Sequence, residues 1–249
     1  MTSGASRLAT SINRVATTFW RSLGRLLGLL PIQRVVKELT RRGVDLRHRR
    51  GLDLYGGSGE RTTRHYARLL ASLDVWEIDP SCEAALRRNL PGARIKICDS
   101  YEEIRRAEGR YGFVVLDSPT SNHGGHTEHF DMFPHVFRVM DDDCVLILHV
   151  ISEADSRTRR NYPYLFNQAQ LDRRRSFYES AHPEKLSPEQ LAAHYRRLLE
   201  RNGFAPEWHF VVPRWELRHF IPLPINMFYL VVKVGRTRRL AADGGRPSR

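Results

Sequence analysis

Residues 51–60, GLDLYGGSGE, decide the fold, because a short apolar run ends at an acid and leads directly into a glycine-rich turn. Asp53 stands between two leucines, and three glycines follow it within six residues. Glycines at the start of a helix let the backbone approach a ligand closely, and the helix N-terminus offers it free N–H groups. The stretch therefore predicts a strand, a tight turn and a helix that begins at a ligand.

Short apolar runs alternate with helical segments along the rest of the chain, which is typical of βαβ units around a parallel sheet. Further strands are predicted at 74–79, 93–99, 112–118 and 144–151, and helices at 60–73, 81–90, 100–107 and 128–140. Another helix is predicted over 187–203, with Ser187 and Gln190 as a capping box and Gly203 as its C-cap. Two strands at 206–215 and 227–234, joined by residues 216–226, close the chain.

The glycine-rich turn does not match the dinucleotide-binding pattern GxGxxG, because Glu60, Arg61 and Thr62 follow Gly59. The carboxylate of Glu60 would also repel a pyrophosphate bound at this helix start. These residues argue against an NAD-type cofactor.

LDLYGGSG, with its acid and its glycines at a strand-to-helix turn, resembles the first motif of the class I S-adenosylmethionine-dependent methyltransferases. The resemblance covers residues 51–151 and implies an α/β fold, a three-layer Rossmann-like sandwich whose mostly parallel sheet has an antiparallel last strand. It also implies S-adenosylmethionine as the cofactor. Tyr55 stands where the commonest form of the motif has glycine, and an aromatic residue there resembles a variant found in several nucleic-acid methyltransferases.

The later motifs of this family are polar or acidic residues at strand ends, and the chain has an acid at each place. Glu77 ends the second strand, where the family's acid binds both ribose hydroxyls, although Asp79 competes with it. Asp99 and Asp117 end the third and fourth strands. The resemblance thus implies cofactor contacts from Asp53, Tyr55, Gly57, Ser58, Gly59, Glu77, Ile78, Asp99 and Asp117. Because acids at strand ends are often helix N-caps, a catalytically inactive nucleotide-binding α/β domain is the alternative.

The segment after Asp117 lies beside the transferred methyl group in this family. Here it begins DSPT, without the second proline and the aromatic residue of the D/N-P-P-Y/F motif, so methylation of base amino groups is disfavoured. His126 and His129 are the candidate general bases or acceptor contacts, and Asp117 is a third catalytic candidate. No metal site is predicted, because no ligand pair has a known spacing. A metal held by this loop, or a polar loop in which Thr127 caps the next helix, are the alternatives.

The net charge of +12 is concentrated at the two ends of the chain. Residues 1–50 carry 11 basic and 2 acidic side chains, residues 235–249 carry 5 and 1, and residues 51–234 carry 24 and 25. The predicted organisation is a basic N-terminal extension (1–50), a methyltransferase domain (51–234) and a disordered basic tail (235–249). A near-neutral domain is poor evidence for a nucleic-acid-binding face.

Residues 7–30 have the pattern of a basic amphipathic helix, with an apolar stripe from Ile12 to Leu30 and arginines roughly opposite it. Such a helix could pack on the domain, lie on an anionic membrane surface or direct the chain to an organelle. Three scattered cysteines favour a reducing compartment, so a cytoplasmic location is expected, with a membrane surface or an organelle as the alternatives.

Residues 152–186 are predicted to form an irregular insertion that contributes to the substrate site. Its aromatic residues and its run Arg173–Arg175 could bind single-stranded nucleic acid, a sugar or an anionic lipid-linked substrate. Its seven basic and five acidic residues leave only a modest net charge.

Together these features predict a methyltransferase for an acceptor of unidentified class, slightly favouring the hydroxyl of a small-molecule, saccharide or lipid-linked substrate. An RNA methyltransferase is the first alternative, with nucleic acid as a less favoured partner. The alternative of a different class is a non-catalytic nucleotide- or nucleic-acid-binding α/β module. The acceptor atom and the oligomeric state are not predicted.

Overall fold

The structure, a computed structural model, describes residues 30–118, 122–123, 126–153, 156–218 and 221–236. The predictions for residues 7–29 and for the tail after residue 236 lie outside the described residues. No helix within the described ranges has the length and apolar character needed to cross a membrane.

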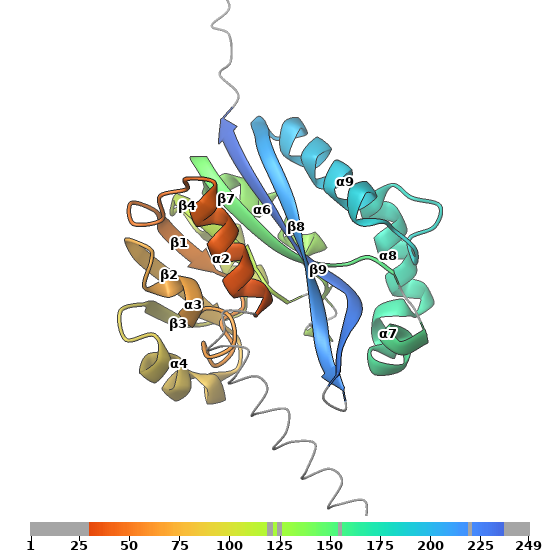
Figure 1. The fold of residues 1–249 in the computed structure, drawn as a ribbon, viewed down its shortest axis with the longest axis horizontal. Helices are drawn as coiled ribbons and strands as arrows, with labels where there is room; N and C mark the ends of the chain where they lie inside the picture. Colours follow the sequence, from red (N-terminus) through yellow and green to blue (C-terminus); the bar gives the residue numbers. More distant parts are fainter. Residues whose placement is uncertain (1–29, 119–121, 124–125, 154–155, 219–220, 237–249) are drawn as a thin grey trace, which may run out of the picture.

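A seven-stranded sheet runs through the molecule in the order β3-β2-β1-β4-β7-β9-β8 (Figure 1). In chain order, its strands are β1 Arg50–Asp53, β2 Ser72–Glu77, β3 Arg94–Ile97, β4 Tyr111–Leu116, β7 Met140–Ile151, β8 Phe204–Arg218 and β9 Ile221–Arg236. The first five of these pair in parallel, whereas β9 runs antiparallel to both β7 and β8. The prediction of a mostly parallel sheet with an antiparallel last strand is confirmed.

Helices cover both faces of this sheet and complete three layers. α2 (Pro31–Arg41), α3 (Arg64–Ala67) and α4 (Glu83–Asn89) share one apolar core with residues of β2, β4 and β7. α5 (Ser100–Arg106), α6 (His135–Val139) and α9 (Pro188–Arg201) share a second core. β4 is buried along its whole length because helices cover it from both sides, which explains its uninterrupted apolar sequence.

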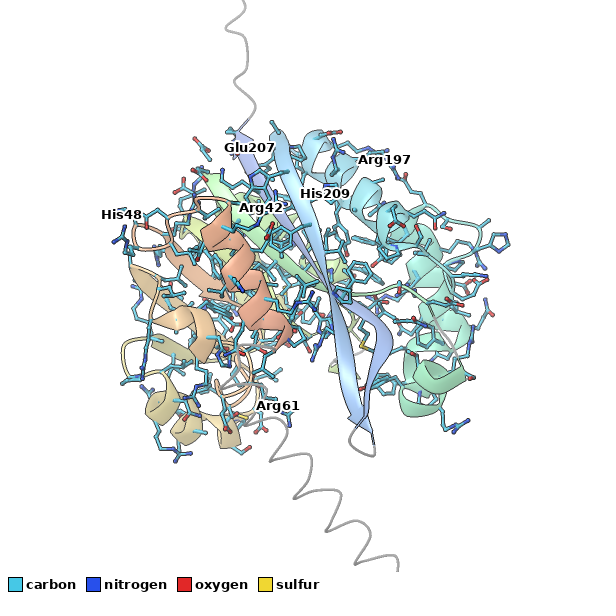
Figure 2. All side chains as sticks on the ribbon, in the orientation of Figure 1. Arg42, His48, Arg61, Arg197, Glu207 and His209 are labelled. Carbon is cyan, nitrogen blue, oxygen red and sulfur yellow. The ribbon has the colours of Figure 1, made fainter. Side chains whose placement is uncertain are left out.

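The outer strand β8 is covered by the end of α2. Figure 2 shows Arg42 beside β8, and its guanidinium carbon lies 4.9 Å from the ring centroid of Trp208 and 5.1 Å from that of Phe210. The two rings also stack on each other. These contacts protect the aromatic side chains of an edge strand from solvent.

The helix predicted over 187–203 is confirmed as α9, together with its caps. Ser187 Oγ accepts from the backbone N–H of Gln190 at 3.2 Å, and Gln190 Oε1 accepts from the backbone N–H of Ser187 at 2.8 Å. Gly203 follows the helix with φ 80°, a conformation that glycine adopts at little cost.

Two predicted helices are wrong in extent. The helix over 60–73 is reduced to Arg64–Ala67, because the side chain of Thr63 is held by Asp53 and the N–H of Ala71 bonds to the Arg49 carbonyl. The helix over 128–140 is split into a 3₁₀ turn, η2 (Phe130–Met132), and α6, because Pro134 has no N–H to continue the helical bonding.

The insertion and the last connection are more regular than predicted. The described part of 152–186 includes α7 (Ser156–Asn161), a 3₁₀ turn η3 (Pro163–Phe166) and α8 (Gln168–Tyr178). Leu165 and Phe166 are buried against Ile151 and Met227, so the insertion is anchored to the sheet. Residues 216–218 continue β8 and residues 221–226 begin β9, and the two strands pair as far as Arg218 and Ile221 because each backbone finds its hydrogen-bond partners in the other.

Candidate functional site

Four acidic residues lie along one edge of the sheet. Asp53, Glu77, Asp99 and Asp117 follow or end β1, β2, β3 and β4, and these parallel strands are neighbours in the order β3-β2-β1-β4. Carboxyl ends of parallel strands meet at the same edge, where open α/β sheets bind ligands. The structure therefore brings the four predicted acids together.

Asp53 is enclosed by its own neighbourhood. Its Oδ2 accepts from the hydroxyls of Thr63 at 2.6 Å and Tyr66 at 2.5 Å, and its Oδ1 accepts from the backbone N–H of Tyr55 at 3.1 Å. Burial raises the pKa of Asp53 to about 6 against the effect of these three bonds. The carboxyl group thus ties β1 to the glycine turn and to α3.

The glycine turn combines tight packing with an open side. A Cβ at Gly56 would lie 2.3 Å from Val75, and one at Gly59 would lie 2.9 Å from Leu90. Gly57, in contrast, has φ 52° and no atom within 4 Å of the place where a Cβ would stand. A ligand can therefore approach the turn at Gly57, while Gly56 and Gly59 allow the turn to pack closely against β2 and the end of α4.

Glu77 lies beneath that open side. Its Oε2 accepts from the backbone N–H of Gly57 at 2.5 Å, and its Oε1 accepts from the N–H of Asp79 at 2.9 Å. Asp79 is exposed and caps the 3₁₀ turn η1 (Pro80–Cys82) by accepting from the N–H of Ser81 at 2.9 Å. Of the two competing acids, Glu77 is the one that faces the turn.

The side chains predicted to lie near the adenine stand next to each other along the edge. Ile78 follows Glu77 and is half-buried. Asp99 caps α5 by accepting from the backbone N–H of Tyr101 at 2.8 Å. The T-shaped ring pair of Tyr55 and Tyr101, with centroids 6.4 Å apart, joins the glycine turn to the start of α5.

Asp117 has partners that the sequence analysis did not identify. His149 Nδ1 lies 2.8 Å from Asp117 Oδ1, and the hydroxyl of Tyr229 donates to Oδ2 at 2.9 Å. The guanidinium of Arg214 completes the group, 3.6 Å from Oδ1. Burial opposes ionisation of Asp117, but the bond to His149 and the charges around it hold its pKa below the usual value. A histidine inside the buried run CVLILHVI was the available signal, since buried polar groups need partners.

The two histidines predicted as bases occupy different environments. His126 Nδ1 lies 2.5 Å from Asp131 Oδ2, and about a quarter of its side chain is exposed. His129 is fully buried, with Nε2 at 2.6 Å from the hydroxyl of Tyr195. Burial lowers the pKa of His129 to about 3. Of these two histidines, only His126 is partly exposed.

The basic run of the insertion is neutralised by ion pairs. Arg173 pairs with Asp131, Arg174 with Glu128 and Arg175 with Asp172. All three arginines are on α8, which lies beside α7 and α9 (Figure 1). The prediction that all three residues Arg173–Arg175 could bind a substrate needs correction, because Arg174 lies in the core.

Arg174 connects three segments of the chain around the loop after β4. Besides its pair with Glu128, it donates to the carbonyls of Ile151 at 3.0 Å and Pro183 at 2.9 Å. The insertion, the end of β7 and the loop after β4 are thus held by one buried guanidinium.

The described residues contain no group of three or more histidine, cysteine or acidic side chains placed to hold a metal ion. A hollow of about 610 Å³ lies at the amino ends of β2 and β3, lined by residues of 64–73 and 89–93 and by Gln33. It is at the opposite end of these strands from the acids, so it does not form part of the candidate site.

Neither a protein-family model nor a curated protein matches the sequence. Among solved structures, a proposed RNA methyltransferase of Pyrococcus horikoshii is similar to the chain at 12% identity, covering 83% of each chain with a TM-score of 0.50. TYW2 of M. jannaschii, solved in complex with AdoMet, is 15% identical over 81% of this chain and 75% of its own, with a TM-score of 0.44. A proposed methyltransferase of Bacillus halodurans C-125 is 12% identical over 80% and 96%, with a TM-score of 0.48. With its strand order and antiparallel β9, the chain has the Rossmann-like fold of the class I S-adenosylmethionine-dependent methyltransferases.

Proposed function

We propose that the protein is an S-adenosylmethionine-dependent methyltransferase. The observation that carries the proposal is the position of Glu77, whose carboxylate lies against Gly57 at the open side of the glycine turn. A carboxylate at the open side of a glycine turn suits the two hydroxyls of a ribose, and the half-buried Ile78 suits the face of an adenine. The donor set therefore fits the cofactor.

Bound there, the cofactor would supply an activated methyl group on a sulfonium. The chain's own residues would bind and orient it: Glu77 at the ribose, Asp99 at the end of β3 near the base, and Gly57 at the open side of the turn. Asp53 would keep the turn in place through Thr63 and Tyr66. The main contribution of such a site to the rate is proximity and orientation.

Calorimetry with S-adenosylhomocysteine tests this assignment. The wild-type protein should bind, and Glu77→Ala should bind about 10- to 100-fold more weakly, the effect of removing a hydrogen bond to a charged group. Asp79→Ala is the matched control, because Asp79 is two residues away and caps η1. No binding by the wild type, or equal losses in the two variants, would contradict the assignment.

For the acceptor, we propose the hydroxyl of a small-molecule, saccharide or lipid-linked substrate. The near-neutral charge of residues 51–234 and the three ion pairs of Arg173–Arg175 support this choice, since a nucleic-acid groove needs unneutralised cations. His126, on the loop after β4, would contact the acceptor. RNA is the second candidate, because a similar fold belongs to a proposed RNA methyltransferase. A labelled-methyl transfer screen over RNA, lipid, polysaccharide and protein fractions separates them.

We also propose a cytoplasmic location with residues 7–30 at a membrane surface. The support is the sequence pattern of those residues, an apolar stripe with arginines opposite. Co-sedimentation with anionic vesicles, compared between the full chain and a chain that begins at residue 30, tests it. Equal binding of the two proteins would refute the membrane role.

A further inference from the structure

Four neighbouring strands contribute one polar side chain each to a row that begins at Asp117. His149 lies on β7, Tyr229 on β9 and Arg214 on β8, and His149 and Tyr229 are directly opposed in the β7–β9 register. The side chains of Asp117 and His149 are 10% and 4% exposed, whereas that of Arg214 is 33% exposed. The row therefore leads from the fourth predicted acid to the protein surface.

Arg214 is placed by an irregularity in β8. The register between β8 and β9 shifts between Pro213 and Trp215, so Arg214 sits where the ladder is interrupted. Its guanidinium lies over the ring of Tyr229, 5.4 Å from the centroid. Bulges of this kind redirect side chains and are common next to active sites.

The hydrogen bonds of the row determine which nitrogen of His149 carries the proton. Arg214 Nη1 lies 2.7 Å from Nδ1 and 2.8 Å from Nε2 of the imidazole. Arg214 is about equally close to both nitrogens, but the carboxylate of Asp117 can only accept, so its 2.8 Å contact assigns the proton of the neutral ring to Nδ1 and leaves Nε2 unprotonated. Burial and the adjacent Arg214 lower the pKa of His149 to about 4. At neutral pH the ring is therefore a neutral base oriented by a carboxylate.

We propose that His149 is the catalytic base of this site, that Asp117 positions it, and that the acceptor is a hydroxyl group which meets His149 Nε2 and Arg214 together. The inference rests on the proposed function and deepens it. An acceptor hydroxyl that takes the place of the guanidinium beside Nε2 would donate to Nε2 and accept from Arg214. A cation next to the oxygen stabilises the negative charge that develops as the proton leaves.

These groups account for every bond and proton that changes in the proposed methyl transfer. The acceptor oxygen forms a bond to the methyl carbon as the carbon–sulfur bond breaks, and the electron pair of that bond stays on sulfur, which becomes a neutral thioether. The hydroxyl proton moves to His149 Nε2, and the resulting imidazolium is stabilised by Asp117. The proton later returns to solvent, and no further reactant is needed.

His149 is preferred to His126 for this role because of its neighbours. Asp117, which orients His149, directly follows β4, and β4 pairs with β1, which ends at Asp53 and leads into the glycine turn. His126 is oriented instead by Asp131 and stacks on Tyr101 of α5. His149 is thus oriented by one of the four acids of the strand edge, whereas the partner of His126 is not among them, which leaves His126 as an acceptor contact.

The test compares His149→Ala and His149→Gln with His194→Gln, a substitution of another buried histidine that lies on α9. All three variants should bind S-adenosylhomocysteine within a few-fold of wild type. In the fraction that accepts labelled methyl groups, both His149 variants should lose about 10²- to 10⁴-fold in rate, the usual contribution of a general base. Free imidazole should restore part of the activity of His149→Ala, which a structural role would not allow.

Nitrogen-15 spectra of the imidazole rings provide a readout that needs no acceptor. In the wild type, His149 should be the Nδ1–H tautomer and stay neutral at pH 6, and Arg214→Gln should make it easier to protonate. An Nε2–H tautomer, an undiminished rate in both His149 variants, or a lost rate that imidazole does not rescue would overturn the inference. Failure of the wild type to bind S-adenosylhomocysteine would instead refute the proposed function itself.

Discussion

Tyr101 stacks on His126, with ring centroids 4.0 Å apart and an angle of 11° between the planes. The contact joins the first turn of α5 to the loop after β4, and the hydroxyl of Tyr101 donates to the carbonyl of Glu128 in the same loop. Position 126 is therefore held from two sides, by an aromatic face and by Asp131.

The stack should be visible in the proton spectrum of His126. In Tyr101→Leu, the ring-current shift of the imidazole protons should disappear, because no aromatic ring remains next to them. Tyr101→Phe is the control, since it keeps the ring and loses only the hydroxyl. An unchanged His126 spectrum in Tyr101→Leu would show that the two rings do not stack in solution.

Removal of Arg174 should be far more destabilising than removal of its neighbour. Arg174→Met would leave Glu128 as an unpaired charge in the core, which typically costs about 3–5 kcal/mol. Arg175→Met removes an exposed pair with Asp172 and should cost at most about 1 kcal/mol. Urea unfolding of both variants measures the difference, and the double variant Arg174→Met/Glu128→Gln should recover part of the loss. Similar losses for the two arginines would contradict a buried pair.

Stability should fall on mild acidification because of His129. Its pKa is about 3 in the folded protein, through burial, against about 6.5 in an unfolded chain. Below pH 6.5 the unfolded state binds a proton that the folded state does not, so the contribution is complete above that pH and declines as the pH falls towards 3. The slope is about 1.4 kcal/mol per pH unit.

Urea unfolding of wild type and His129→Gln at pH 7 and pH 5 checks this dependence. The wild type should lose more stability between the two values than the variant. Asp53, with its pKa raised to about 6, acts in the opposite direction, but it is present in both proteins and its effect cancels. Equal losses would mean that His129 is protonated in the folded protein.

Two adjacent glycines should respond differently to alanine. Gly56→Ala forces a Cβ to within 2.3 Å of Val75 and should lower stability by about 1–3 kcal/mol. Gly57→Ala meets no atom and carries only the strain of its positive φ, about 1 kcal/mol, yet its methyl group would enter the open side of the turn. Melting curves together with calorimetry on S-adenosylhomocysteine separate the effects. Retained binding in Gly57→Ala would show that the cofactor does not pass over this glycine.

The sequence was sufficient for features that depend on local pattern. Apolar runs located all seven strands of the main sheet, and the acids at the ends of four of them marked the candidate edge, because parallel strands share a carboxyl end. The capping box of Ser187 and Gln190 was also predictable, because its two members are only three residues apart in the sequence. Helix lengths were less accurate where a side chain such as Thr63 bonds outside the helix.

Contacts between distant residues could not be predicted. Tyr229 and Asp117 are 112 positions apart, and no periodicity indicates that they meet. The burial of His129 and Arg174 depends on how α8 and α9 pack on the loop after β4, which is a property of the assembled layers. Only the structure distinguishes the partly exposed His126 of this histidine-rich loop from the buried His129.

The place of β9 has a consequence for biosynthesis. It follows β8 in the sequence but lies between β7 and β8, so β8 pairs with no other strand of the described sheet. Until residues 221–236 emerge from the ribosome, the nascent chain carries the open edge of β7 and an unattached β8, both able to pair with other chains. A premature stop before β9 would therefore yield a fragment prone to aggregate, because the sheet is incomplete without residues 221–236.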